Sequence, residues 1–126
     1  MNKLLIVALL GLVAACAPVQ PVAVSDLSNM PAEQALLTGI RLYEDGQYGP
    51  AERELQRALD LKLHAAKDVA NANKYLAFVY CTSERLQACE QAFRAARAAQ
   101  PDFALSKSEA GHPVWGPVYQ RVIEQR

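Results

Sequence analysis

The sequence predicts an all-α protein, and three observations support this prediction. From Leu76 to Ala96, apolar residues recur at steps of three and four, which places them on one stripe of a helix with about 3.6 residues per turn. Alanine is abundant, and no stretch alternates apolar and polar residues with the two-residue period of a strand. Pro101 ends this region, because a proline ring cannot continue a helix without a clash. The stretch 70–101 therefore predicts two amphipathic helices around the polar break 82–85.

The length and composition are those of one globular domain without a nucleic-acid-binding surface. The chain has 126 residues, of which 52% are hydrophobic, and thirteen acidic residues balance its thirteen basic ones. The two charge types are interspersed, as on solvated helix faces, whereas a nucleic-acid footprint needs a concentrated basic face. We therefore expect no nucleic-acid partner.

Residues 1–15 are predicted to be a signal peptide that lies outside the fold. Lys3 gives a positive start, and the apolar run from Leu4 to Val13 is shorter than the about 20 residues of a membrane-spanning helix. The small residues that follow lead into Cys16 as VAAC, which resembles the lipobox of bacterial lipoproteins. The resemblance implies that Cys16 becomes the first mature residue and carries a diacylglycerol. The alternative is an ordinary cleaved signal with an incidental cysteine.

Residues 16–30 are expected to form a lipidated, flexible tether. They contain Pro18 and Pro21 and show no helical period. At about 3.1 Å per extended residue, the tether would reach up to about 40 Å from the membrane. Ala17, in place of an acid, resembles the signal for export to the outer membrane. We therefore expect a lipid-anchored protein of the outer membrane that faces the periplasm, with no cofactor besides the acyl lipid on Cys16.

The first helical hairpin opens the domain 31–126. Pro31 suits a first helical turn, the helix is expected to end at Glu44, and Gly46 supplies the backbone freedom that the turn needs. A second helix is expected to open at Gly49, directly before a proline. Its inner face is expected to hold Ala51, Leu55, Ala58, Leu59 and Leu61.

The second hairpin repeats the first. Its helices are expected from Asp68, as N-cap, to Thr82 and from 86 to about 100. Small residues recur thirty-eight residues apart, pairing Gly39, Ala51 and Ala58 with Ala77, Cys89 and Ala96. This pattern resembles tetratricopeptide repeats, in which small residues let the two helices of a unit approach, although that repeat has about 34 residues. The extra residues fall in the connector 63–67.

Two repeats bury little surface, so a C-terminal cap is expected from about residue 102. Ser106 and Glu109 match a capping box, and Gly111 ends that short helix. A last helix is expected from Gly116, with Val118, Val122 and Ile123 facing inward. Trp115 is expected to cover the open end of the second hairpin.

Cys81 and Cys89 are predicted to form a disulfide. They lie four residues either side of Arg85, the centre of the predicted bend, so they face each other across the two helices. The periplasm is oxidising, and closing so small a loop would stabilise the fold by about 2.5 kcal/mol. The alternative is a redox or metal pair, but the spacing is not CxxC and no histidine is near.

The first helix of each hairpin is expected to line a concave groove for a protein partner. The groove is predicted to comprise Leu36, Ile40, Tyr43, Asn71, Lys74 and Phe78. Its apolar positions suit an amphipathic helix or an extended peptide. Alternatively, the segment 27–30 or the C-terminal helix folds back and fills it. Asn71 and Lys74 would receive a partner's carboxylate or remain a solvated pair.

No catalytic or metal site is predicted. His64 and His112 are the only histidines, and neither has partners at metal-ligand or triad spacing. His64 is expected to be a connector residue and His112 to pack in the capping turn. The sequence has no glycine-rich phosphate loop and no distinctive carboxylate pair. We therefore expect no enzyme and no small-molecule substrate.

From about residue 36 to residue 119 the chain resembles one family. The lipobox, the stretches GIRLYEDGQYGPAERELQRAL and KYLAFVYC, and the tail GHPVWGPVY with the two cysteines are similar to the TssQ-type lipoproteins of type VI secretion systems. These are small, tetratricopeptide-like lipoproteins. The resemblance implies a scaffold that binds an envelope component of the secretion apparatus, and it implies no catalytic residue.

Two functions follow as expectations. The first is an accessory lipoprotein that supports type VI secretion. The second is a general lipoprotein of envelope biogenesis, serving outer-membrane protein assembly, pilus assembly or peptidoglycan synthesis. Sheath and baseplate genes beside this gene would favour the first.

Overall fold

The computed structural model describes residues 30–125, and within this range the fold is all-α. Six helices follow one another and no strand is present: α2 (Pro31–Glu44), α3 (Tyr48–Asp60), α4 (Ala66–Thr82), α5 (Leu86–Ala99), α6 (Lys107–Ala110) and α7 (Gly116–Glu124). The predicted fold class is confirmed. The predicted signal peptide, Cys16 and nearly all of the tether lie outside the described residues.

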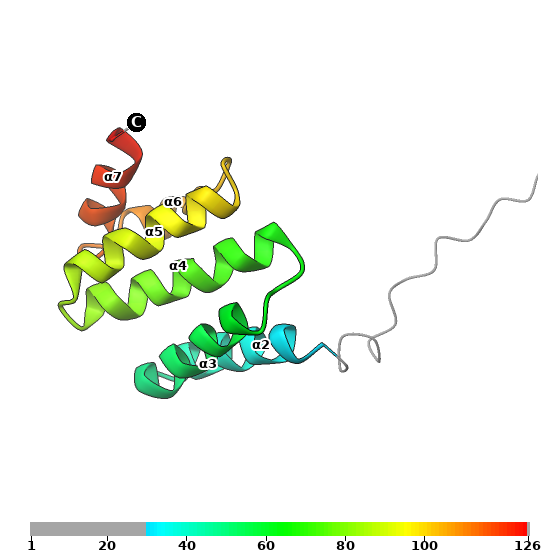
Figure 1. The fold of residues 1–126 in the computed structure, drawn as a ribbon. Coiled ribbons are helices and arrows are strands. Elements are labelled where there is room, and N and C mark those ends of the chain that lie inside the picture. The colour runs from blue at the N-terminus through cyan, green and yellow to red at the C-terminus, as the bar shows by residue number, and fades with distance from the viewer. Residues whose placement is uncertain (1–29, 126) are drawn as a thin grey trace, which may run out of the picture.

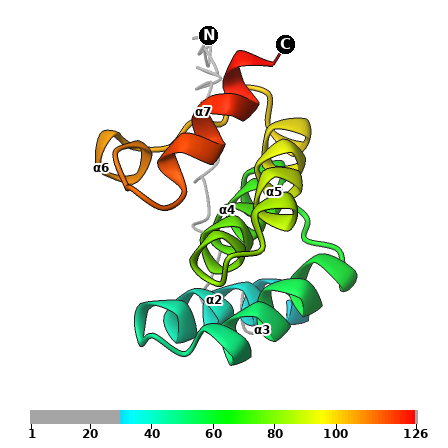
Figure 2. The same ribbon diagram turned by 90° about the vertical axis from the view of Figure 1, so that its left-hand side faces the viewer.

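The helices form two antiparallel hairpins and a cap. Helix α2 pairs with α3 and α4 with α5, and α4 packs against both helices of the first hairpin. Figure 1 shows the second hairpin lying across the first, and Figure 2 shows α6 and α7 beside the second hairpin. The predicted order of two hairpins and a C-terminal cap is therefore present.

The two bends repeat each other at the level of single hydrogen bonds. In the first bend, Gln47 N–H donates to the carbonyl of Leu42 at 2.8 Å, and in the second Arg85 N–H donates to Tyr80 at 2.8 Å. Both bends place one residue at positive φ, Gly46 at 77° and Glu84 at 63°. A left-handed residue closes a helix by bonding its last carbonyls. Glu84 does so in spite of its side chain, and the predicted thirty-eight-residue period is thus present in the backbone.

Small residues allow the helices to cross closely. Ala51, Ala58, Ala77, Cys89 and Ala96 are all 0% exposed. The larger core residues fill the space between the hairpins and under the cap: Leu36, Leu55, Leu76, Phe78, Phe93, Trp115, Val118, Tyr119 and Val122. Burial of these side chains is the main stabilising term of the fold.

Three predicted details of the helix ends were wrong. Helix α3 begins at Tyr48, one residue before Gly49. Leu61 is 42% exposed because α3 ends at Asp60, so Leu61 leaves the inner face. Asp68 lies in the first turn of α4 and Ala65 is the N-cap. An acid in the first turn still interacts favourably with the positive end of the helix dipole.

The cap was predicted closely. Ser106 and Glu109 form the capping box, with Glu109 N–H to Ser106 Oγ at 3.2 Å and Ser106 N–H to Glu109 Oε2 at 2.9 Å. Gly111 is the C-cap of α6. Trp115 is 8% exposed, and its ring stacks on Phe78 with the centroids 4.2 Å apart. The cap therefore covers the second hairpin as predicted.

Candidate functional site

The predicted concave groove is not open along its length. Leu36 is 4% exposed and Phe78 is 2% exposed, so neither is available to a partner. Phe78 lies under Trp115, whose indole N–H donates to the carbonyl of Glu109 at 2.8 Å. The assignment of Leu36 and Phe78 to a partner surface is therefore corrected. The chain's own cap covers Phe78. Burying this large apolar side chain stabilises the folded state more than leaving it exposed to water.

Ile40 and Tyr43 lie at the edge of the hydrophobic core and do not line a groove. Both are partly buried and pack against the core. Tyr43 contacts the rings of Tyr48, Tyr75 and Phe78 at centroid distances of 5.4, 5.1 and 6.1 Å. Burial, with smaller effects of Tyr48 and Tyr75, raises the pKa of Tyr43 to about 12. These rings stabilise the end of the first hairpin through edge contacts.

Asn71 and Lys74 are the predicted groove residues that still meet an open space. They line a hollow of about 180 Å³ with Lys67, Gln100, Phe103 and Ala104. Lys74 Nζ lies 2.9 Å from Glu109 Oε1, so this lysine is tied to the cap. The six predicted groove residues therefore do not form one continuous surface.

The opposite side of the second hairpin carries a larger groove that the sequence analysis did not identify. Residues of α3, α4 and α5 line it, and its volume is about 350 Å³. The lining residues are Gln56, Leu59 and Asp60 from α3, Asn73, Leu76 and Tyr80 from α4, and Ala88, Gln91, Ala92 and Ala95 from α5. We call this space the α3–α5 groove.

The α3–α5 groove combines apolar and amide side chains. Ala88, Ala92 and Ala95 lie at helical spacing along one wall, next to the buried stripe of Cys89 and Phe93. Small side chains let another backbone approach closely, and the amides of Gln56 and Gln91 are suited to hydrogen bonding at the rim. The signal in the sequence was this second alanine stripe, of which Ala92 is buried in the core while Ala88 and Ala95 are more exposed.

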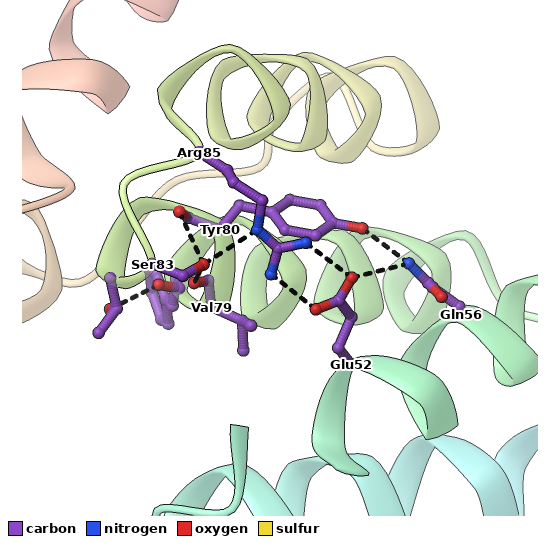
Figure 3. Close-up of polar contacts among 8 residues, drawn as sticks. Glu52, Gln56, Val79, Tyr80, Ser83 and Arg85 are labelled. Atoms are coloured by element: carbon purple, nitrogen blue, oxygen red, sulfur yellow. Dashed lines mark hydrogen bonds and ion pairs between the residues drawn. The ribbon is translucent and has the colours of Figure 1, made fainter. Parts of the chain in front are cut away.

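A hydrogen-bonded network joins the two hairpins at one end of the α3–α5 groove (Figure 3). Arg85 Nη1 and Nη2 donate to Glu52 Oε1 and Oε2 at 3.0 and 2.7 Å. Gln56 Nε2 donates to Glu52 Oε1 at 3.2 Å and to the Tyr80 hydroxyl at 3.0 Å. The guanidinium carbon of Arg85 lies 4.7 Å from the centroid of the Tyr80 ring. The network fixes the side chains of Gln56 and Tyr80, which line the groove.

Arg85 keeps Glu52 in its ionised form. Its hydrogen bonds are the largest cause that holds the pKa of Glu52 below the ordinary value of 4.5. Glu52 is therefore ionised at neutral pH, and the pair is bidentate, the geometry that fixes an arginine most strongly. The two opposite charges of the pair therefore balance each other beside this end of the groove.

The predicted disulfide is present. Cys81 at the end of α4 and Cys89 in α5 are bonded, with their Cα atoms 5.2 Å apart. The two residues are 2% and 0% exposed. The bond fixes the bend that supports Arg85 and the α5 wall of the groove.

The two histidines do not come together. His64 Nδ1 lies 2.8 Å from Glu33 Oε1, and its backbone N–H donates to the same oxygen at 3.2 Å. This contact ties the connector to the first turn of α2 and was not predicted. His112 stacks on Trp115 with ring centroids 3.4 Å apart, as expected for a residue of the capping turn.

Metal-binding clusters and membrane-spanning helices are both absent from residues 30–125. No group of three or more His, Cys, Asp or Glu side chains there is arranged to hold a metal ion. None of the helices in this range has the length and apolar character to cross a bilayer.

No protein-family model, no curated protein and no solved structure matches this chain significantly.

Proposed function

We propose that the protein is a membrane-anchored, periplasm-facing scaffold that binds a protein partner, and that it serves a type VI secretion system as an accessory lipoprotein. The single observation that supports a binding role best is the α3–α5 groove, an apolar floor with amide rims between two hairpins. The lipobox at Cys16 supports the anchor, and the resemblance of residues 36–119 supports the secretion system.

The groove is suited to an amphipathic helix from the partner. Ala88, Ala92 and Ala95 leave room for a helix, while Leu59, Leu76 and Tyr80 offer apolar contacts. Asp60 is the charged side chain of the lining, and Gln56 and Gln91 add uncharged hydrogen-bonding groups, so recognition depends on shape and amides together with this one charge. A partner helix with a narrow apolar stripe between polar residues fits these features.

Ala95→Glu tests the groove. Ala95 is exposed on the α5 wall, so a carboxylate there blocks the groove without disturbing the core. Ala98→Glu is the matched control, because Ala98 is exposed on the same helix and does not line the groove. We expect chemical crosslinking in intact envelopes to capture a type VI membrane-complex component with wild type and Ala98→Glu, and at least tenfold less with Ala95→Glu.

Equal capture by the three forms would refute the groove as the binding surface. Capture of proteins of outer-membrane assembly, pilus or peptidoglycan machinery instead would refute the assignment to secretion and favour the general envelope lipoprotein.

The anchor is tested separately. We expect Cys16→Ala to move the chain from the membrane pellet to the soluble fraction and to abolish labelling by palmitate. If the Cys16→Ala variant stayed in the membrane pellet, the proposed lipid anchor would be contradicted. The proposal that the α3–α5 groove binds a partner would not be affected.

A further inference from the structure

We infer that the hollow between α4 and the α5–α6 connection binds a carboxylate group presented by a protein partner. The hollow has a volume of about 180 Å³ and is lined by Lys67, Asn71, Lys74, Gln100, Phe103 and Ala104. It is separate from the α3–α5 groove, whose lining it does not share. The inference rests on the proposed function only in taking a protein as the source of the carboxylate.

Three polar side chains of the hollow are free to bind. Lys67 and Asn71 lie one turn apart on α4, and Gln100 approaches from the end of α5. Within residues 30–125 these three side chains make no hydrogen bond or ion pair. None of their polar atoms is buried, so they meet solvent in this hollow and can exchange it for a ligand. They offer one ammonium and two amide groups to an acceptor.

Lys74 fixes the inner wall of the hollow. Its side chain is 15% exposed, and Nζ donates to Glu109 Oε1 at 2.9 Å. The other carboxylate oxygen of Glu109 accepts the N–H of Ser106 at 2.9 Å, so Glu109 is fully engaged by the capping box and Lys74. Nζ also lies 4.8 Å from the centroid of the Tyr75 ring. The lysine is therefore held in place, and Lys67 supplies the unpaired positive charge.

Size and charge favour the C-terminal carboxylate of a partner chain that ends in a small apolar residue. The volume of about 180 Å³ admits a carboxylate and a small residue. Phe103 and Ala104 provide the apolar wall. Asp68, Asp102 and Glu109 do not line the hollow, so within residues 30–125 no carboxylate belongs to its lining.

The experiment compares two forms of one peptide. Fluorescein-labelled Gly-Ser-Gly-Ala-Ala is prepared with a free C-terminal carboxylate and with a C-terminal amide, and its anisotropy is titrated with the complete chain. We expect the acid to bind at least tenfold more tightly than the amide, because the amide removes the charge-assisted hydrogen bonds. Lys67→Gln and Asn71→Ala are each expected to weaken the acid by threefold to tenfold.

Lys62→Gln is the control, because Lys62 is an exposed lysine of the connector that does not line the hollow. It is expected to leave the affinity for the acid unchanged, and thermal melts of all variants are expected to match wild type. Equal affinity for acid and amide, or no binding of either, would overturn the inference. So would displacement of the acid by an equal concentration of inorganic phosphate, which would show a site for any oxyanion. Each of these results is independent of whether Ala95→Glu blocks partner capture.

Discussion

At the scale of single residues, the crossing of α2 and α3 depends on the missing side chain of Gly39. A Cβ atom at Gly39 would lie 2.7 Å from Leu55 Cγ and 3.1 Å from the backbone nitrogen of Leu55. Leu55 is 0% exposed and cannot move aside. The first unit of the repeat therefore needs glycine where the second has Ala77.

Gly39→Ala is expected to destabilise the fold. Alanine gains about 1 kcal/mol of helix propensity, but the clash with Leu55 costs about 1–3 kcal/mol, so a net loss of up to about 2 kcal/mol is expected in urea unfolding. Gly49→Ala is the control, because its nearest neighbour would be Arg53 Nη1 at 3.9 Å. That variant should be as stable as wild type or more so. Equal stability of Gly39→Ala and wild type would contradict this prediction, because it would show that α2 and α3 can shift to accommodate the added methyl group.

The Glu52–Arg85 pair makes stability depend on pH. Because the pKa of Glu52 in the folded protein lies below its ordinary 4.5, ionised Glu52 stabilises the fold above that pH. This contribution is lost as the pH falls through the lower folded pKa. The pair is partly exposed, with Arg85 at 45%, so its contribution is about 0.5–1 kcal/mol.

Arg85→Gln is therefore expected to be less stable than wild type at pH 7 and to approach it at pH 3, as measured by urea unfolding. Arg121→Gln, at an exposed position of α7, should match wild type at both pH values. A difference for Arg85→Gln that stays the same at pH 3 would assign the effect to the contact with Tyr80.

At the scale of the elements, the disulfide is expected to contribute most of the rigidity of the second bend. Closing the loop between Cys81 and Cys89 corresponds to about 2.5 kcal/mol, and each kcal/mol shifts the melting temperature of a domain of this size by about 4–8 °C. A reductant should thus lower the melting temperature of wild type by about 10–20 °C. The double variant Cys81→Ala/Cys89→Ala should melt at the lower temperature with or without reductant. An unchanged melting temperature of reduced wild type would contradict this role.

The helices were predictable because their apolar spacing and their caps are local. Pro31, Gly46 and the Ser106–Glu109 box lie where the sequence places them. The start of α4 was not predictable, because it depends on a contact across thirty-one residues. His64 N–H binds Glu33 Oε1, and this fixes the direction of the connector before Asp68 is reached. Asp68 consequently lies inside the helix.

At the scale of the whole molecule, Leu36 and Phe78 of the predicted groove are buried, and the surface that we propose for the partner lies on the other side of the second hairpin. The repeat pattern correctly places Phe78 on the inner side of α4, but it contains nothing about what lies against that side. Trp115 covers Phe78 from thirty-seven residues further along the chain, a contact that no local period reveals. The α3–α5 groove, in contrast, follows from a second alanine stripe on α5 that the sequence does contain.

The cap is expected to be part of the core and not a removable cover. Trp115 is 8% exposed, stacks between Phe78 and His112, and bonds the carbonyl of Glu109, which itself holds Lys74. Truncating a buried tryptophan removes its apolar contacts and leaves a cavity, so Trp115→Ala should lower the free energy of unfolding by about 3–5 kcal/mol.

Urea unfolding would measure this loss, with Val114→Ala as the control because Val114 is 42% exposed beside it and should cost less than about 0.5 kcal/mol. If Trp115→Ala instead costs less than about 1 kcal/mol, the cap contributes little to the core and the inner side of α4 is open to a partner. A large loss means that any partner must bind the surface that the cap leaves exposed, which includes the α3–α5 groove.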